Sequence, residues 1–204
     1  MTPRLVAIHL ATTGLPKGMG VDDPAYPRML RIGGVQWMRG EEPIGRIQEF
    51  VRQDDARTSR GAERVHGISD RLAGQMGMDE RHALSWITHA LRQSTHIVGW
   101  NLSFWLDVVR AGLIRHHQDP DALIRPGVIK IDLGEIMAPI VGKQDEEGRI
   151  VRPTLDEGYQ HLMGREITGR QDCYHDALAC REIFERLCER DFVPDMASGE
   201  RKVA

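Results

Sequence analysis

The chain has 204 residues, of which 41% are hydrophobic and 28% are charged, with a net charge of −3 at pH 7. This composition is that of one globular domain with a buried core, and it excludes a disordered or fibrous chain. No apolar stretch approaches the roughly 20 residues of a membrane span, so no membrane partner is expected. The N-terminus shows no secretory signal, and three cysteines make no disulfide framework, so a cytoplasmic location is expected.

Three strands are predicted in the first quarter of the chain. Residues 4–10 form a short apolar run that ends at a Thr-Thr-Gly turn, and the loop that follows is rich in glycine and proline. Residues 28–38 and 44–51 are strand-like and flank a hairpin signal at 39–43. We expect the three strands to form an antiparallel meander.

The rest of the chain alternates between predicted helices and strands. A helix is predicted over 81–93, where apolar residues recur at helical spacing. The elements expected after it are a strand at 96–99, a helix from the cap Asn101 to residue 113, a strand at 127–132, a short helix from residue 153 and a long helix at 174–188. The fold class is therefore α/β, with a five-stranded mixed sheet flanked by helices. The domain is predicted to span residues 1–190, and residues 191–204 to form a polar tail.

Four segments, in order along nearly the whole chain, carry a family resemblance. They are His9-Leu10-Ala11-Thr12-Thr13-Gly14-Leu15, His66-Gly67-Ile68, Gly99-Trp100-Asn101-Leu102-Ser103-Phe104-Trp105 and His175-Asp176-Ala177-Leu178-Ala179-Cys180. This set resembles the DEDDh 3′–5′ exonucleases, the superfamily of proofreading subunits and domains of bacterial DNA polymerases. There the corresponding motifs read Asp-x-Glu-Thr-Thr-Gly-Leu, His-Gly-Ile, Gly-His-Asn-x-x-Phe-Asp and His-x-Ala-Leu-x-Asp. The resemblance implies an RNase H-like fold, with an antiparallel meander and two parallel strands.

The residues that carry the family's chemistry differ here. In the family, four carboxylates hold two divalent metal ions, and a histidine is the general base. The carboxylate positions are His9, Ala11, Trp105 and Cys180 in this chain, and only the histidine, His175, is kept. Because Mg²⁺ prefers carboxylate and water oxygens, we expect no Mg²⁺ or Mn²⁺ site and no cofactor.

Two carboxylates close to these positions are candidate replacements for the lost ligands. Asp107 lies two residues beyond Trp105, about 200° around a helix, and Asp176 is about 100° from His175. Neither is therefore expected to point where the family's ligand points.

The former metal cleft admits three interpretations if His9, His175 and Cys180 converge there. Imidazole and thiolate would suit a transition metal, although Zn²⁺ usually takes four ligands. A histidine could instead activate Cys180 as a nucleophile. In the third interpretation, which we favour, these side chains are simply packed in the core.

Other residues of the four motifs are candidates for binding a nucleotide. Trp105 either plugs the cleft, the interpretation we favour, or offers a stacking face to a base. The kept turn of the first motif lies against the terminal nucleotide in the family, although it also reads as an ordinary turn. The binding candidates are Thr12, Thr13, Gly14, Leu15, His66, Trp100, Asn101 and Phe104, with Lys17, Arg28 and Arg31 as possible phosphate contacts.

These observations predict a pseudo-exonuclease. We expect a module that binds single-stranded nucleic acid or a nucleotide, or one that docks a protein partner in a DNA replication, repair or processing assembly. The alternatives are an enzyme with a cleft repurposed around His9, His175 and Cys180, and a still-active 3′–5′ exonuclease with rebuilt metal ligands. A purely structural subunit is a further interpretation.

Overall fold

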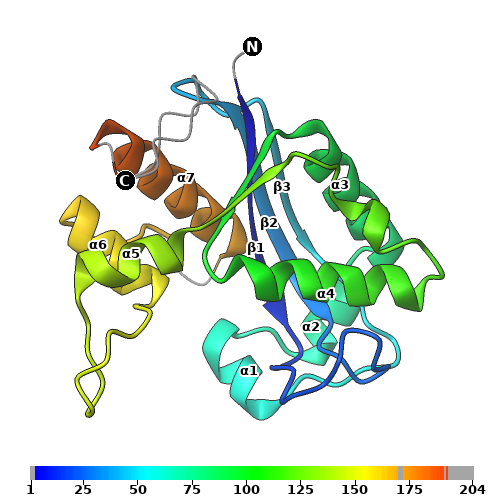
Figure 1. Cartoon of the computed structure of the whole chain (residues 1–204). Coiled ribbons are helices and arrows are strands. Elements are labelled where there is room, and N and C mark those ends of the chain that lie inside the picture. The colour runs from blue at the N-terminus through cyan, green and yellow to red at the C-terminus, as the bar shows by residue number, and fades with distance from the viewer. Residues whose placement is uncertain (1–2, 170–171, 191, 193–204) are drawn as a thin grey trace.

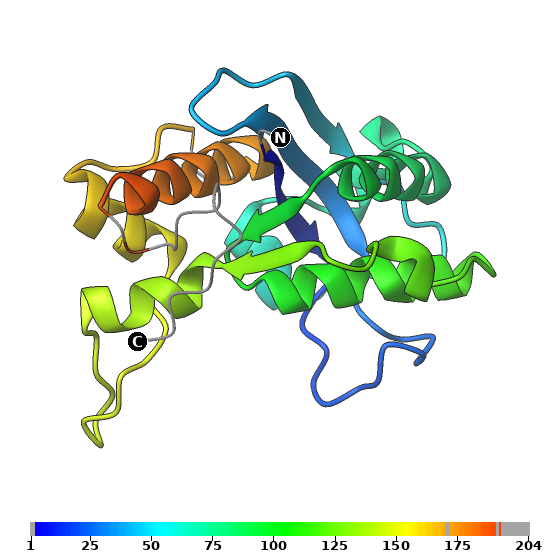
Figure 2. The ribbon, with the colours of Figure 1, turned by 45° about the horizontal axis from the view of Figure 1, so that its top comes forward.

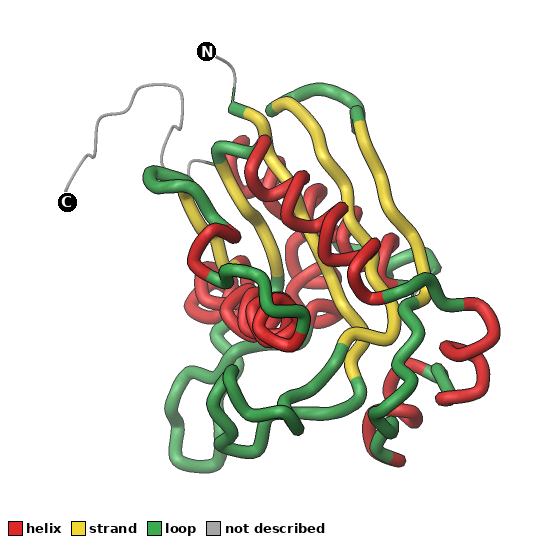
Figure 3. Tube along the Cα trace, turned by 90° about the vertical axis from the view of Figure 1, so that its right-hand side faces the viewer, coloured by secondary structure: helices red, strands yellow, loops and turns green. Residues whose placement is uncertain are grey.

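A single twisted sheet organises the chain in the computed structural model, which describes residues 3–169, 172–190 and 192. Its strands are β1 (Arg4–Thr12), β2 (Met29–Met38), β3 (Gly45–Phe50), β4 (His96–Gly99) and β5 (Ile129–Asp132). They lie side by side in the order β3-β2-β1-β4-β5 (Figure 3). The pairs β1–β2 and β2–β3 are antiparallel, and β4 runs parallel to β1 and to β5. The expected five-stranded mixed sheet is therefore confirmed.

Helices cover both faces of this sheet, as expected. They are α1 (Arg60–His66), α2 (Asp70–Met76), α3 (Glu80–Gln93), α4 (Leu102–Arg115), α5 (Leu133–Val141), α6 (Leu155–Met163) and α7 (Cys173–Glu189), with a short 3-10 turn at Asp121–Leu123. Figures 1 and 2 show α3 and α4 on one side of the sheet and α5, α6 and α7 on the other. None of the helices in the described part of the chain is long and apolar enough to cross a membrane.

The alternation of side chains along β1 divides the core into two layers. Val6, Ile8 and Leu10 pack in the cluster that includes α3 and α4. Leu5 and Ala7 pack in the cluster on the α7 side. Because alternate residues of a strand share a face, residues 9 and 11 also point toward the α7 side. This register brings the first motif beside the helix that carries the last one.

The start of α7 approaches the sheet very closely. A Cβ added at Gly33 of β2 would lie 1.9 Å from the carbonyl carbon of Cys173 and 2.1 Å from the amide nitrogen of Tyr174. Only a residue without a side chain leaves room for the helix backbone at this distance. Gly33 therefore lets α7 begin directly over β2, next to the end of β1.

The helix cap predicted at Asn101 is supplied by another residue. Asn101 occupies the N-cap position of α4 with a left-handed backbone, but its side chain does not cap the helix. The Asp132 carboxylate accepts hydrogen bonds from the backbone N–H groups of Asn101 (3.2 Å), Leu102 (2.8 Å) and, at the start of α5, Gly134 (3.0 Å). One carboxylate at the end of β5 thus fixes the starts of two helices.

Three helices were not predicted from the sequence. No residue of α1 and only Ala73 of α2 is buried, so neither helix has an apolar stripe to reveal it. In α5 the interior Pro139 argues against a helix, yet the chain continues through it. The predicted tail 191–204 lies outside the described residues except for Phe192.

Candidate nucleotide-binding cavity

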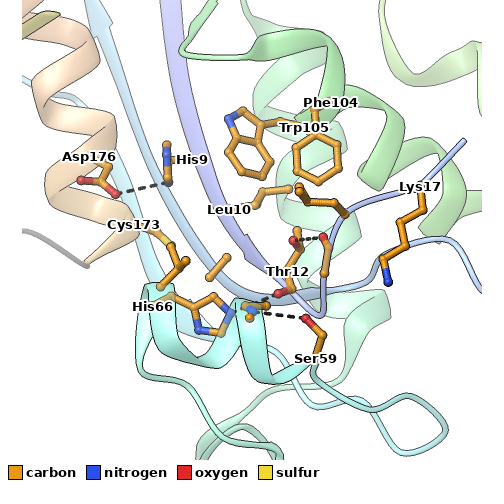
Figure 4. Close-up of a pocket in the computed structure, with 16 residues that line it drawn as sticks. His9, Leu10, Thr12, Lys17, Ser59, His66, Phe104, Trp105, Cys173 and Asp176 are labelled. Carbon is orange, nitrogen blue, oxygen red and sulfur yellow. Dashed lines mark hydrogen bonds and ion pairs between the residues drawn. The ribbon is translucent and has the colours of Figure 1, made fainter. Parts of the chain in front are cut away.

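A cavity of about 570 Å³ opens at the C-terminal end of β1. Its wall is built from the last residues of β1, the turn that follows, one side of α1, and the first turns of α4 and α7 (Figure 4). The predicted site residues that line it are His9, Ala11, Thr12, Gly14, Leu15, His66, Phe104 and Trp105. Thr13, Trp100, Asn101, His175 and Cys180 do not line it. The four motifs therefore meet at the cavity, but only some of the predicted side chains line it.

An aromatic wall closes one side of the cavity. The Trp105 indole lies 4.9 Å from the His9 ring and 4.7 Å from the Phe104 ring, measured between ring centroids. Its Nε1 donates a 2.7 Å hydrogen bond to the carbonyl oxygen of Trp100, which fixes the ring orientation. Trp105 is half-buried and borders the open space without filling it. Trp105 therefore occupies part of the cleft, against His9 and Phe104, and a cavity stays open beside it, so the idea that it plugs the cleft stays a prediction.

Asp176 lies in the cavity, against expectation. Its carboxylate oxygen lies 3.4 Å from His9 Nδ1, and its side chain is only 3% exposed. Its expected direction was taken relative to His175, whereas the face of α7 that meets the sheet carries Cys180. Because residues four apart on a helix share a face, Asp176 lies one turn from Cys180, nearer the cavity. Asp107 lies elsewhere, with its carboxylate 3.4 Å from Arg110.

Cys180 lies in the interior and does not reach the cavity. It is fully buried in the core between α7 and the sheet. Burial, reinforced by the nearby Asp176 charge, raises the pKa of the Cys180 thiol far above its ordinary value. A thiol held in this way is not an activated nucleophile, which favours the packing interpretation for Cys180.

His175 does not line the cavity either. Its Nδ1 lies 3.8 Å from an Asp172 oxygen, and its ring packs so closely on Gly169 that a Cβ there would lie 2.8 Å away. His9, His175 and Cys180 thus do not converge. Within residues 3–169, 172–190 and 192, no group of three His, Cys, Asp or Glu side chains is placed to hold a metal ion.

The donor set of the cavity does not fit the two-metal centre of the exonuclease family. Such a centre needs several carboxylate oxygens around two ions about 4 Å apart. Asp176 is the carboxylate at this wall, and it already lies against His9. The methyl group of Ala11 and the indole of Trp105 offer no oxygen ligand.

Hydrogen bonds within the chain hold the Thr-Thr-Gly turn. Thr12 Oγ1 donates to the Gly14 carbonyl (2.8 Å), and the Thr13 hydroxyl accepts from the Arg28 backbone N–H (3.0 Å). His66 Nδ1 accepts from the Ile68 N–H (3.1 Å), so Nε2 carries the proton and donates to the Thr12 carbonyl (3.1 Å). Burial lowers the pKa of His66, which keeps the ring neutral. The turn and α1 are therefore joined at one edge of the cavity.

Of the three basic residues predicted to contact phosphate, only Lys17 lines the cavity. Arg28 pairs with Asp55, and Arg31 pairs with Asp172 at 2.8 Å and stacks on the Phe50 ring. Both guanidinium groups are therefore engaged in contacts within the chain. Among the residues that line the cavity, Lys17 therefore carries the positive charge.

Comparison with known proteins gives matches by structure alone. No protein-family model and no curated protein matches the sequence. E. coli exonuclease I in complex with a dA16 oligonucleotide superposes with a TM-score of 0.74 and 19% identity, over 92% of this chain and 41% of that one. Exonuclease I from Methylocaldum szegediense gives 0.73 and 19%, over 92% and 41%. An SSB/exonuclease I structure with an inhibitor gives 0.72 and 18%, over 94% and 43%.

These matches establish the fold. The chain spans less than half the length of the exonuclease I structures, and fewer than one residue in four is identical. The superposition with E. coli exonuclease I nevertheless covers 92% of the present chain at a TM-score of 0.74. The chain has the RNase H-like α/β fold of exonuclease I, as its resemblance to the DEDDh exonucleases predicts.

Proposed function

We propose that this chain is a non-catalytic relative of the 3′–5′ exonucleases that binds the end of a single-stranded nucleic acid, or a nucleotide, in the cavity at the end of β1. The observation that carries this proposal is an open cavity of about 570 Å³ whose wall is aromatic and apolar, with Asp176 as its carboxylate. This volume lies within the range of small-molecule sites, roughly 300–1,000 Å³.

The lining suits a planar base with an attached phosphate. Phe104 and Trp105 present aromatic rings at the wall, and base–aromatic stacking contributes about 1–3 kcal/mol per base. Leu15 and Lys17 lie on the facing loop and add an apolar contact and a positive charge. An oligonucleotide is bound in one of the matched E. coli exonuclease I structures, which supports this ligand class.

Hydrolysis by the family's route is not part of the proposal. Attack on a phosphodiester by that route requires metal ions to bind both the attacking and the leaving oxygen. The side chains at His9, Ala11, Trp105 and Cys180 do not supply the ligands, and Asp176 alone does not replace them. The kept scaffold would therefore retain binding without cleavage.

The test is a binding and cleavage assay on one labelled single-stranded DNA oligonucleotide in Mg²⁺, in Mn²⁺ and in EDTA. We expect binding that is indifferent to metal, without shortening of the oligonucleotide. Trp105→Leu should weaken binding roughly 5- to 150-fold, the range that corresponds to one lost stacking contact. Trp86→Leu is the matched control, because Trp86 is half-buried on α3 and does not line the cavity.

Two results would refute the proposal. Absence of binding at low salt, where electrostatic attraction is strongest, would leave a structural subunit as the better interpretation. Metal-dependent shortening that Asp176→Asn abolishes would show that the chain is an exonuclease with a rebuilt metal site.

A second candidate function rests on the contact between His9 and Asp176. A buried carboxylate beside an imidazole nitrogen that faces a cavity is an arrangement that orients a histidine for proton transfer. This candidate predicts a metal-independent turnover of a cavity ligand that is lost in both His9→Gln and Asp176→Asn. Unchanged ligand after prolonged incubation with the wild-type chain in EDTA would exclude it.

A further inference from the structure

Helix α1 forms one wall of the cavity, although none of its residues is buried. The residues of this helix that line the cavity are Gly61, Ala62, Val65 and His66. Val65 is 72% exposed even though it faces this wall. Because α1 gains so little free energy from packing, its position depends on the polar contacts at its two ends.

Two hydrogen bonds tie α1 to the end of β1, one from each end of the helix. Directly before the helix, the Ser59 N–H donates to the Thr13 carbonyl at 2.8 Å. At the last residue of the helix, His66 Nε2 donates to the Thr12 carbonyl at 3.1 Å (Figure 4). The two ends of α1 are therefore fixed to neighbouring carbonyl groups of the chain that forms the opposite wall.

The link made by His66 depends on the protonation state of its ring. Nδ1 accepts a hydrogen bond from the Ile68 N–H at 3.1 Å, so the ring that donates through Nε2 is neutral. A second proton would bind to Nδ1 and would place one donor against another. Since the two nitrogens belong to one rigid ring, a rotation that moves Nδ1 away from Ile68 also moves Nε2 away from Thr12.

The surroundings of His66 favour the neutral ring. Burial lowers the pKa of His66, and this effect outweighs the hydrogen bond to Thr12 and the charge of Glu63 on the same helix, which raise it. The other titratable groups that line the cavity belong to β1, the loop after it and α7, and they are His9, Lys17, Cys173 and Asp176. The link is therefore complete above about pH 6.5 and is lost as the pH falls through the lowered pKa of His66.

We propose that His66 is a positioning residue that holds α1 against the end of β1 while its ring is neutral, and that uptake of a proton releases this wall and weakens ligand binding in the cavity. This inference rests on the proposed function for its ligand and adds a control of that site by pH.

The release would be confined to α1, because the chain is anchored on both sides of it. The Thr58 hydroxyl donates to the Asp70 carboxylate at 2.6 Å, and Ile68 is 2% exposed in the apolar cluster with Ala11. Gly67, between α1 and Ile68, has a φ of 71°, a conformation that glycine adopts without strain. A local change at this residue lets α1 move while its flanks stay in place.

Two substitutions of His66 separate its two hydrogen bonds. The amide nitrogen of glutamine lies as far along the side chain as histidine Nε2, so His66→Gln can keep the donor to Thr12 and does not titrate. The amide oxygen of asparagine lies as far along as Nδ1, so His66→Asn can keep the acceptor for Ile68 and loses the link to Thr12. His161→Gln is the matched control, because His161 is exposed on α6 and does not line the cavity.

Hydrogen exchange of the α1 amides without ligand tests the release directly. Mass spectrometry follows the exchange at about pH 8 and at about pH 5, with correction for the intrinsic pH dependence and with α3 as the internal reference. In the wild-type chain, α1 should exchange roughly 2- to 10-fold faster at the lower pH, the range that corresponds to one lost hydrogen bond. His66→Gln should exchange slowly at both pH values, His66→Asn rapidly at both, and His161→Gln as the wild-type chain does.

The affinity for a labelled oligothymidylate, whose bases take up no proton in this range, tests the consequence for the cavity. Between the two pH values, the affinity of the wild-type chain should fall roughly 2- to 10-fold more than that of His66→Gln. The comparison removes any contribution of His9, because both proteins retain it.

The outcomes separate the two proposals. A wild-type chain that binds no oligonucleotide at either pH refutes the proposed function and, with it, the control of binding, whereas the exchange of α1 decides by itself whether His66 holds the helix. Exchange of α1 that changes neither with pH nor in His66→Asn refutes the role of His66. Faster exchange at the lower pH, together with equal changes of affinity in the wild-type chain and His66→Gln, refutes only the control of the cavity by pH.

Discussion

Replacing Gly33 by alanine tests how closely α7 must approach the sheet. The added Cβ would lie 1.9 Å from the Cys173 carbonyl carbon, about 1.5 Å short of ordinary contact at 3.4 Å. The obstacle is helix backbone, which cannot rotate away as the tip of a side chain does. Overpacking a core costs about 1–3 kcal/mol when side chains can adjust, so a displaced helix backbone should cost at least about 3 kcal/mol.

The effect should appear both in stability and in binding. For a chain of this size, about 3 kcal/mol corresponds to a fall in Tm of roughly 6–12 °C, measurable by circular dichroism. Cys173 and Asp176 lie on the displaced turn and line the cavity, so ligand affinity should fall even where the variant remains folded. Urea unfolding with linear extrapolation gives the free energy of unfolding directly.

The neighbouring Gly34→Ala substitution is the matched control. Gly34 is on the same strand, but a Cβ there would meet the ring of Trp86 at 3.0 Å and the Ile47 side chain at 3.2 Å. Those groups can shift by a few tenths of an ångström, so the cost should stay below about 1 kcal/mol. The Gly34→Ala variant should melt within about 4 °C of the wild-type chain. A Gly33→Ala variant that melts as close to the wild-type chain as this control would contradict the close approach of α7.

Three further predictions concern the same framework. Asp132→Ala removes the acceptor of three backbone N–H groups and should lower the free energy of unfolding by about 2–3 kcal/mol. Thr154→Ala, which uncaps one helix, should lower it by about 1 kcal/mol. Equal losses of the two variants in urea unfolding would contradict this prediction. Burial lowers the pKa of His96 below its ordinary 6.5, so stability should be complete above about pH 6.5 and fall as the pH drops below it, with a weaker fall in His96→Gln. Burial raises the pKa of Cys173 to about 12 and that of Cys180 still further, so Ellman's reagent should label both thiols slowly in the native protein. A rapidly labelled thiol that is absent from the Cys180→Ser variant would support Cys180 as a nucleophile.

The parts of the fold that bury an apolar pattern could be predicted from the sequence. The strands and the helices α3, α4, α6 and α7 each place hydrophobic residues on a core face, and their predicted bounds agree with the structure within a few residues. Helix α1 carries no such pattern, because Ser59 and His66 fix it through hydrogen bonds that periodicity does not reveal. The prediction of Asn101 as the cap of α4 was wrong for a related reason, because the capping carboxylate of Asp132 lies thirty residues away in the sequence.

The sequence predicted where in the fold the site lies more accurately than which side chains line it. Eight of the predicted residues do line one cavity, because motif order fixes which strand end and helix start meet. Asp176 was assigned the wrong direction because the reference taken was His175, whereas the face of α7 that meets β1 carries Cys180, one turn from Asp176. His175 was expected at the site because of its motif, yet its ring packs on Gly169.

Two of the positions that differ from the exonuclease motif carry side chains that pack in apolar clusters. Cys180 is fully buried in the core under α7, and Ala11 packs with Leu30, Ile68 and Cys173 in a small apolar cluster. A carboxylate at position 180 would be buried among apolar groups, where its charge is costly unless a cation compensates it. We therefore expect Cys180→Asp to destabilise the fold, whereas a carboxylate at Ala11 would lie at the wall of the cavity. Binding in the open cavity, in contrast, would require none of the family's metal ligands, and this difference supports our proposal that the chain recognises a nucleic-acid end without cleaving it.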